Sequence, residues 1–210
     1  MEPFVLANDR VRLTPATESD VDAITAWCQD DEVRQWTTIP WPYEREHSEY
    51  YVETVIPDGW HSEKDYTWII RDAAAYTEGG PEPVALGTMT LRPDNADEGL
   101  QSGEIAFAVA PEARGKGFAT AAALLALEWG FSPEGLNLAR ATWRAALGNW
   151  WSRRVAWKCG FQVEAVIRAE VPMRGQRGDG WLATLLPNDP RQPNEDWPAD
   201  APWPGTGEAA

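Results

Sequence analysis

The residues best suited to chemistry form a short loop with two glycines and two basic side chains, Arg114-Gly115-Lys116-Gly117-Phe118-Ala119-Thr120. Glycine lets a backbone approach a ligand closely, and the free N–H groups of a first helical turn attract anions. The loop is therefore predicted to bind an anionic group of the phosphate type.

Two common phosphate-binding motifs do not fit this loop. A P-loop needs Ser or Thr after its Gly-Lys pair and a glycine upstream, whereas here Gly117 follows Lys116 and Ala110 stands upstream. A dinucleotide-binding motif needs a third glycine, but Thr120 occupies that position. It also needs an acidic residue about 20 residues further on, and the segment Gly135–Val163 contains no Asp or Glu. Both motifs are rejected.

The same segment, Gly135–Val163, carries the positive charge that a phosphate ligand requires. It has five basic residues in a chain whose net charge is −15, namely Arg140, Arg144, Arg153, Arg154 and Lys158. A polyphosphate ligand explains this local excess economically, and solvated helix charges are the alternative.

The totals describe an acidic globular protein of ordinary size. Its 210 residues suit one domain with its own core, and 43% hydrophobic with 24% charged residues is a globular composition. The net charge of −15 argues against a nucleic-acid partner. No apolar run approaches the roughly 18 residues of a membrane helix, and the N-terminus lacks the pattern of a signal peptide. A cytoplasmic protein without a membrane partner is expected.

Cysteine and histidine are too few for metal chemistry. Cys28 and Cys159 cannot build a disulfide framework, and neither has a His or Cys at metal-binding spacing. His47 and His61 are the two histidines of the chain, so a histidine-rich site is excluded and no metal cofactor is expected.

The loop needs a strand before it and a helix after it, and the sequence predicts both. Residues 104–110 are short and apolar, and Pro111 ends the strand because proline has no N–H to donate. The run Phe118–Trp129 is rich in Ala and Leu, so a helix is expected from about Lys116.

Alternating and amphipathic patterns predict the other elements. Strands are expected over residues 9–15, 66–71, 83–91, 138–143, 161–171 and 180–186, and helices over 18–28, 44–55 and 148–159. The result is an α/β (α+β) domain with a mixed, mostly antiparallel sheet of about seven strands flanked by helices.

The composition changes near residue 187. Residues 1–187 are interpreted as the folded domain, and residues 188–210, the C-terminal tail, are acidic and rich in proline. The tail has too few apolar residues for a core of its own. Trp197 and Trp203 are the residues able to attach it to the domain surface.

Three groups of residues give the chain a family resemblance over about residues 8–187. They are Asp9-Arg-Val-Arg-Leu-Thr-Pro15 with Asp20, the Arg-x-x-Gly-x-Ala pattern of the loop, and Asn149-x-x-Ser-x-x-Val-x-x-Lys-x-Gly160-Phe161. With the order of the elements, they resemble the GNAT N-acetyltransferase superfamily, in its RimJ/RimL-like branch.

The resemblance implies a fold in which the strand before the loop splays from its neighbour. Backbone groups of Phe107, Ala108 and Val109 would then face the pantetheine arm of coenzyme A. The loop amides, from Arg114 to Thr120, would bind its pyrophosphate. Asn149 would cap the following helix and contact the cofactor. Acetyl-CoA is therefore the expected co-substrate.

The chain departs from the family at the usual general acid. Many GNAT enzymes have a tyrosine four residues before the glycine of the Gly-Phe pair, where this sequence has Ala156. Ser152 lies one helical turn earlier on the same face, and RimJ/RimL-like enzymes are thought to use a serine there. Ser152 is therefore the candidate acid and a further cofactor contact. A helix-face hydroxyl bonded to the backbone is the simpler alternative.

Two carboxylates are candidates for the general base. Glu104 is favoured because it begins the strand that leads to the expected thioester site. Glu170 is the second candidate, because it lies on a strand that borders the acceptor site in relatives, and a water chain is the third. Glu170, Trp36 and Trp41 are expected to bind the acceptor, in a pocket beside Trp60.

The resemblance implies an acyl-CoA-dependent N-acetyltransferase in which a primary amine attacks the thioester directly, without a covalent enzyme intermediate. The acceptor is a small molecule or a protein N-terminus, and the negative net charge favours a cationic one. A non-catalytic acyl-CoA-binding sensor or interaction module is the alternative. The protein is expected to be a monomer or a homodimer.

Overall fold

One sheet of eight strands carries the fold in the computed structural model, which describes residues 1–94, 96 and 100–202. Its strand order is β1-β2-β3-β4-β5-β6-β8-β7. The strands are β1 (Leu6–Ala7), β2 (Val11–Thr14), β3 (Tyr66–Asp72), β4 (Gly87–Pro93), β5 (Ser102–Val109), β6 (Arg140–Ala146), β7 (Gln162–Met173) and β8 (Gln176–Leu185). The prediction of about seven strands missed β1, whose two residues are too few for a periodic pattern.

Neighbouring strands pair antiparallel except for β5 and β6, which are parallel. The expected mixed, mostly antiparallel sheet is therefore confirmed. The parallel pair requires a crossover, and α5 (Phe118–Phe131) supplies it.

Strand register assigns the side chains of β5 and β6 to two faces. Ile105 pairs with Trp143, and Glu104 pairs with Thr142. Because side chains alternate along a strand, Ile105 and Trp143 share one face, here named the Ile105 face. Glu104 and Arg144 lie on the opposite one, the Glu104 face.

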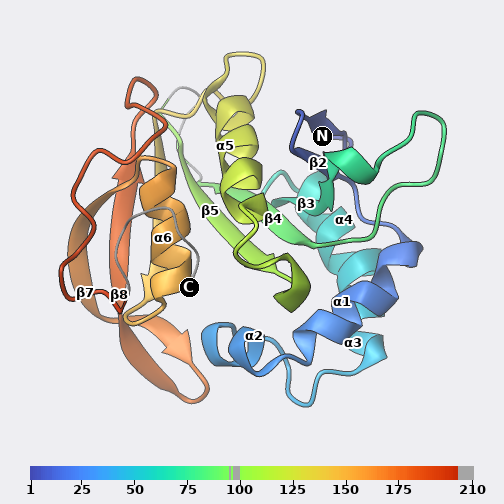
Figure 1. The fold of residues 1–210 in the computed structure, drawn as a ribbon, viewed down its shortest axis with the longest axis horizontal. Helices are drawn as coiled ribbons and strands as arrows, with labels where there is room; N and C mark the ends of the chain where they lie inside the picture. The colour runs from blue at the N-terminus through green and yellow to red at the C-terminus, as the bar shows by residue number, and fades with distance from the viewer. Residues whose placement is uncertain (95, 97–99, 203–210) are drawn as a thin grey trace.

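The helices lie on both sides of the sheet. They are α1 (Val21–Cys28), α2 (Asp31–Trp36), α3 (Arg45–Tyr50), α4 (Ile56–His61), α5 and α6 (Trp150–Lys158). Figure 1 shows α5 and α6 in front of the sheet, α1 and α3 grouped at one side, and α2 between that group and the β7–β8 hairpin.

The helix predicted over residues 44–55 continues to His61. A π-helical segment, Tyr51–Val55, joins α3 to α4. Pro57 then falls in the first turn of α4, where a missing N–H is tolerated because these groups have no partner within the helix. Pro57 therefore does not end the helix, although the predicted helix stopped two residues before it.

Trp60 belongs to the hydrophobic core, so its expected place beside an acceptor pocket was wrong. Its side chain is fully buried, and Nε1 donates a hydrogen bond to the carbonyl of Thr67 at 3.0 Å. Edge-to-face contacts with Phe4, Tyr66 and Trp68 surround it. An indole buries more apolar area here than an open pocket wall would allow.

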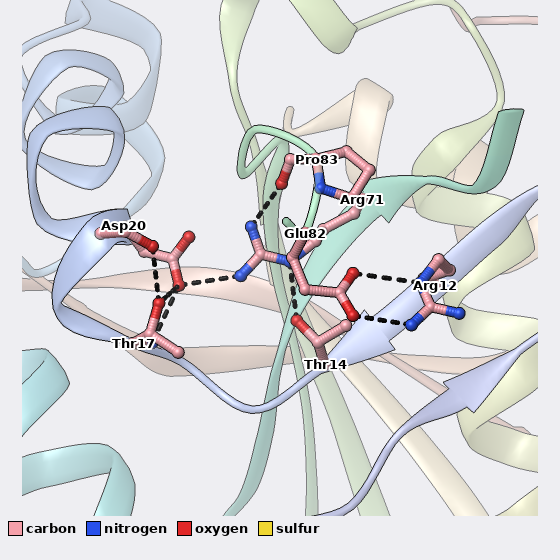
Figure 2. A network of polar contacts seen from close by, with 8 residues as sticks. Arg12, Thr14, Thr17, Asp20, Arg71, Glu82 and Pro83 are labelled. Atoms are coloured by element: carbon pink, nitrogen blue, oxygen red, sulfur yellow. Dashed lines mark hydrogen bonds and ion pairs between the residues drawn. The ribbon is translucent and has the colours of Figure 1, made fainter. Parts of the chain in front are cut away.

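A buried ion pair fastens the start of α1 to the sheet (Figure 2). Arg71 and Asp20 are both 2% exposed and lie 2.9 Å apart. The Arg71 guanidinium also donates to Thr14 Oγ1 at 2.7 Å and to the carbonyl of Pro83 at 2.6 Å. Thr17 donates its backbone N–H to Asp20. Every charged group in this network therefore has hydrogen-bond partners, which offset the cost of burying it.

The last two strands are longer than predicted. The segment 172–179, which separated the two predicted strands, mostly belongs to them, and Met173 pairs directly with Gln176. Glycine weakens strands in general, but here the neighbouring β7 pairs with β8 on both sides of an irregularity between Ile167 and Val171. The turn between the strands is therefore shorter than predicted and lies at residues 174–175.

The C-terminal tail contacts α6 and the glycine that follows it through residues 194–197. Trp157 Nε1 donates to the carbonyl of Glu195 at 2.8 Å, and Asn194 Nδ2 donates to that of Gly160 at 3.0 Å. The ring of Trp197 lies 5.3 Å from that of Trp157. Trp197 thus attaches the tail as expected, while Trp203 lies outside the described residues.

Candidate active site

A cavity of about 390 Å³ lies where the end of β5 meets the loop and α6. Four parts of the chain form its walls, namely α2, β5, the start of α5 and α6. Its lining includes Glu32, Val33, Trp36, Phe107, Ala108, Val109, Arg114, Gly115, Gly117, Phe118, Ala119, Thr120, Asn149, Ser152, Arg154 and Lys158. The structure thus brings together the predicted cofactor contacts with one exception, Lys116.

The start of α5 faces this cavity with free backbone donors. The helix begins at Phe118 rather than near Lys116, because Gly117 adopts a left-handed conformation with φ 82° that favours glycine. No side chain among the described residues caps this helix end. Three N–H groups, of Phe118, Ala119 and Thr120, therefore remain available to an anion.

Arg114 is placed differently from a simple phosphate ligand. Its guanidinium forms ion pairs with Asp30 at 2.5 Å and with Glu32 at 2.7 Å. Burial would raise the pKa of Asp30, but hydrogen bonds from Arg114 and the backbone N–H of Val33 outweigh it and lower that pKa. The side chain therefore links the loop to the first turn of α2.

Lys116 does not line the cavity, and its backbone carbonyl forms a hydrogen bond with a distant arginine. Arg10 donates a hydrogen bond to the Lys116 carbonyl at 2.7 Å. The same guanidinium lies 4.2 Å above the ring of Phe118. Arg10, directly before β2, thus supports the loop through the Lys116 carbonyl and the Phe118 ring.

The strands β5 and β6 separate beside the cavity, which confirms the expected splay. Their last described pair is Ile105 with Trp143, although β5 continues to Val109 and β6 to Ala146. We call this point the fork. Ala108, which belongs to the Glu104 face, also lines the cavity, so the cavity reaches the fork.

Ser152 lies on the cavity wall with its hydroxyl fixed by a tryptophan. Trp143 Nε1 donates to Ser152 Oγ at 3.0 Å, and Asn149 Oδ1 accepts from the Ser152 backbone N–H at 3.2 Å. Asn149 therefore caps α6 as expected. Since indole nitrogen only donates, the Ser152 hydrogen stays free to point elsewhere. Ala156, one turn later, is buried in the core.

The two candidate bases meet at one arginine on the Glu104 face. Arg144 Nη1 lies 3.5 Å from Glu104 and Nε lies 3.5 Å from Glu170. Arg92 approaches Glu104 more distantly, at 3.9 Å. Neither carboxylate lines the cavity itself. About three residues of strand, or roughly 10 Å, separate Glu104 from Phe107 on its wall.

The predicted acceptor tryptophans have different positions. Trp36 lines the cavity, and its ring approaches Gly148 just before α6. Trp41 is not part of that wall in the described structure; its ring lies beneath the guanidinium of Arg34, at 4.4 Å. Arg174, at the tip of the β7–β8 hairpin, donates to the Arg34 carbonyl at 2.8 Å. This hydrogen bond connects α2 to the β7–β8 hairpin at one edge of the sheet.

Fewer basic residues of segment 135–163 line the cavity than the sequence suggested. Of the five basic residues in segment 135–163, Arg154 and Lys158 line the cavity. Arg144 faces carboxylates, Arg140 donates to Ser102, and Arg153 lies over the ring of Trp181. The phosphate interpretation therefore depends on two side chains and the α5 amides.

Several residues of the site escaped the sequence analysis. Trp143 was treated only as part of a strand, and Arg144 was counted with the phosphate-binding charges rather than as a partner of Glu104 and Glu170. The partners of both residues are nine or more positions away. Asp30, which caps the start of α2, could have been predicted, because Asp followed by two further acidic residues is typical of a helix N-terminus. Tyr51 does not line the cavity, but its hydroxyl contacts Thr88, which pairs with Ala108 on the cavity wall. Burial raises the pKa of Tyr51 to about 12.

Metal ligands and membrane helices can be assessed over the described ranges. No group of three or more His, Cys, Asp or Glu side chains is placed there to hold a metal ion. Across the same part of the chain, none of the helices combines the length and apolarity needed to cross a membrane. Cys28 and Cys159 are buried and unpaired, and burial raises their pKa values to about 11 and about 12.

Comparison with known proteins agrees with this geometry. The family model "Acetyltransferase (GNAT) domain" matches residues 10–162. A "Putative ribosomal N-acetyltransferase YdaF" of Bacillus subtilis is 32% identical over 136 residues, which is 65% of this chain and 69% of that protein.

Solved structures show the same fold at lower identity. RimJ of Mycobacterium smegmatis, in complex with CoA-disulfide, is 19% identical with a TM-score of 0.74, over 89% of this chain and 90% of its own. The microcin C7 self-immunity acetyltransferase MccE, in complex with acetyl-CoA and AMP, is 17% identical with a TM-score of 0.70, over 85% and 93% of the two chains.

Proposed function

Because this chain belongs to the GNAT acetyltransferase family, we propose that it transfers an acetyl group from acetyl-CoA to a primary amine by direct attack in a ternary complex. The observation that carries the proposal is the uncapped start of α5, which faces a cavity beside the fork of β5 and β6. Amides at a helix start bind pyrophosphate, and the fork leaves strand backbone free for the pantetheine arm.

The loop residues would hold the diphosphate end of the cofactor. The N–H groups of Phe118, Ala119 and Thr120 supply donors, and Lys158 and Arg154 supply positive charge on the opposite wall. A Cβ at Gly115 or Gly117 would meet no atom within 4 Å, so the ligand side of the loop is open. Acetyl-CoA is the co-substrate in this proposal.

The reaction moves one acyl group and one proton. The amine nitrogen attacks the thioester carbon, the carbon–sulfur bond breaks, and the sulfur leaves with the electron pair. Glu104 or Glu170, or water beside them, takes the proton from the nitrogen, and the Ser152 hydroxyl gives one to sulfur. Exchange through solvent then returns the proton from the base to the Ser152 oxygen, so that one proton moves from nitrogen to sulfur in total. The hydrogen bond from Trp143 suits this role, because it stabilises the oxygen after proton loss.

A protein α-amine is the proposed acceptor class, with small-molecule amines as competitors. The relative in Bacillus subtilis is named a putative ribosomal N-acetyltransferase, which favours a protein acceptor. The Glu104 face offers two carboxylates where the strands separate. They suit a positively charged amine that approaches before it loses its proton.

Ala156 supports one alternative, a protein that binds acyl-CoA without turning it over. Its methyl group is buried, so the usual tyrosine acid has no substitute at that position. Release of CoA separates the two functions. Purified protein would be mixed with acetyl-CoA and hexapeptides bearing free α-amines, spermidine or glycinamide, and free thiol would be measured. Thiol release that depends on an amine supports the enzyme, whereas binding without release supports the sensor.

Cofactor binding is tested by thermal denaturation with acetyl-CoA. At about 100-fold excess over Kd, the wild type should gain roughly 3 kcal/mol, and Gly117→Glu should gain nothing because a carboxylate would occupy the pyrophosphate position. Gly117→Ala is the matched control, since it has the same strained conformation without the charge. A wild type that shows no shift with millimolar acetyl-CoA would contradict the proposed function.

A further inference from the structure

Arg144 occupies the fork on the Glu104 face, one residue past the last pair between β5 and β6. The β5 residues of this face that follow Glu104 are Ala106 and Ala108, whose side chains are too short to cover the guanidinium. Arg144 is 46% exposed, while Glu104 and Glu170 are 28% and 23% exposed. A half-exposed cation between two less exposed anions therefore lies at the fork, which the cavity proposed for acetyl-CoA also reaches.

We infer that Arg144 is a positioning residue that holds Glu104 and Glu170 on either side of the fork, and that a bulge in β7 exists to deliver Glu170 to it. The inference rests on the proposed function, because it assigns the two carboxylates their place in the acetyl transfer.

The bulge lies between two regular pairs of the last hairpin. Ile167 pairs with Gly180 and Val171 with Gly178, so three residues of β7 lie opposite one residue of β8. Such an irregularity bends the strand and redirects side chains. Ala169 within the bulge has φ 55°, a conformation that is rare for a residue with a side chain. Glu170 follows directly.

Two side chains hold this bulge in place. Asp179, the single residue opposite, accepts a hydrogen bond from the Ala169 backbone N–H at 3.0 Å. Arg177 donates to the carbonyls of Ala169 and Glu170. The unpaired backbone groups of the bulge thus gain partners, and its strained geometry is retained.

Glu170 reaches Arg144 by crossing β8 above a glycine. The strand β8 lies between β7 and β6, and Gly180 pairs with Ala146 on the Glu104 face. A Cβ at Gly180 would lie 2.8 Å from Val171 Cγ2, 3.0 Å from the Ala145 carbonyl oxygen and 3.3 Å from Glu170 Cβ. Because position 180 has no side chain, the space that the Glu170 side chain crosses to reach Arg144 stays open.

This arrangement explains why both carboxylates are usable at one reaction centre. Arg144 balances their charges, which would otherwise repel each other and push Glu170 towards solvent. Its distances of 3.5 Å to each exceed those of close hydrogen bonds, so neither carboxylate is locked away from a substrate amine. Positioning, rather than direct contact with acetyl-CoA, is the expected role.

The test compares substitutions on β8 that differ in their effect on the bulge. Asp179→Ala removes the bulge contact at an exposed position, and Gly180→Ala places a methyl group in the path of Glu170. Gly178→Ala is the matched control, because a Cβ there would meet no atom within 4 Å. Each protein is assayed with acetyl-CoA and the best amine among the hexapeptides, spermidine and glycinamide. The Kd for acetyl-CoA is measured separately.

Asp179→Ala and Gly180→Ala should each lower kcat about tenfold, as Glu170→Gln should, with the Kd for acetyl-CoA unchanged. Gly178→Ala should keep both values. Arg144→Met should lower kcat similarly, and Arg144→Lys should restore part of it. If Gly180→Ala does not fold, the kcat of Asp179→Ala alone tests the inference.

Two negative results have different meanings. An active wild type with unchanged kcat in Asp179→Ala and Arg144→Met would overturn the inference and leave the proposed function standing. A wild type that releases no CoA with any of these amines would overturn the proposed function, and the inference with it. A third outcome, an equal fall of kcat and of acetyl-CoA affinity in Asp179→Ala, would overturn the inference alone, because the bulge would then affect the whole fold rather than the position of Glu170.

Discussion

Two arginines of this protein pair with carboxylates in opposite ways. Arg71 is 2% exposed and lies 2.9 Å from an equally buried Asp20, and hydroxyl and carbonyl groups accept its other N–H groups (Figure 2). Arg144 is 46% exposed and lies 3.5 Å from each of two carboxylates. The N–H donors of Arg71 are satisfied by groups within the protein, whereas those of Arg144 stay accessible to solvent and substrate.

The difference separates structure from chemistry. A buried pair with complete hydrogen bonding fixes two elements, here α1 and the sheet, and loses several kcal/mol when one partner is removed. A loose and partly exposed pair contributes little to folding, but it can exchange partners with an incoming substrate. The same two residue types thus serve stability at Arg71 and, in our proposal, positioning at Arg144.

The largest effect is expected at the buried pair. Arg71→Met should lower the free energy of unfolding by about 3–5 kcal/mol, because Asp20 would remain charged and buried without its partner. Urea denaturation with an unchanged m-value would measure this loss. A loss below about 1 kcal/mol would show that Asp20 finds water or another partner, and the contrast with Arg144 would fail.

Two hydroxyl groups extend the comparison to turnover. Ser152→Ala should lower kcat roughly 100-fold, because the proposed proton donor is lost, and should leave the Kd for acetyl-CoA nearly unchanged. Thr14→Val is the structural counterpart, since Thr14 accepts from Arg71. It should cost about 1–3 kcal/mol of stability without changing kcat at a temperature where it is folded. Equal kcat in Ser152→Ala and wild type would make Ser152 a structural hydroxyl.

A smaller change in stability is expected at the fork. Arg144→Met should alter the free energy of unfolding by less than about 1 kcal/mol, because exposed pairs contribute little. Urea denaturation under the conditions used for Arg71→Met allows a direct comparison. A loss as large as that of Arg71→Met would place Arg144 with the structural arginines and remove the distinction.

The smallest effect concerns Glu82, at the rim of the Arg71 network in Figure 2. A hydrogen bond from Arg12 lowers the pKa of Glu82 in the folded protein. The pair therefore stabilises the fold above the unfolded pKa of about 4.3, and this stability is lost as pH falls through the folded value. Glu82→Gln should cost less than about 1 kcal/mol at pH 7. Denaturation at pH 7 and pH 3.5 should show this deficit shrinking in acid, whereas a constant deficit would contradict the prediction.

Local sequence signals predicted the parts of the fold that depend on neighbouring residues. Pro111 ended the central strand, alanine and leucine marked α5, and the loop between them lined a cavity as expected. These features depend on backbone chemistry within a few positions. The family resemblance, which the comparison confirmed, joined them into one sheet.

Features that depend on distant partners could not be predicted from the sequence. Nothing near Trp60 distinguishes a core indole from one in a pocket wall, and only packing against β3 decides it. The partners of Arg114 lie 82 and 84 residues away. The bulge before Glu170 requires Asp179 on the opposite strand. Register and tertiary packing determine all three.

The cavity wall has an optical consequence. Trp36 and Trp151 line the space beside the loop, whereas Trp60 and Trp68 are enclosed by the core. An adenine nucleotide that enters the cavity should quench emission from the first pair and leave the enclosed indoles unaffected. Part of the intrinsic fluorescence of the 13 tryptophans is therefore a built-in reporter of occupancy, readable on the stopped-flow timescale without any label.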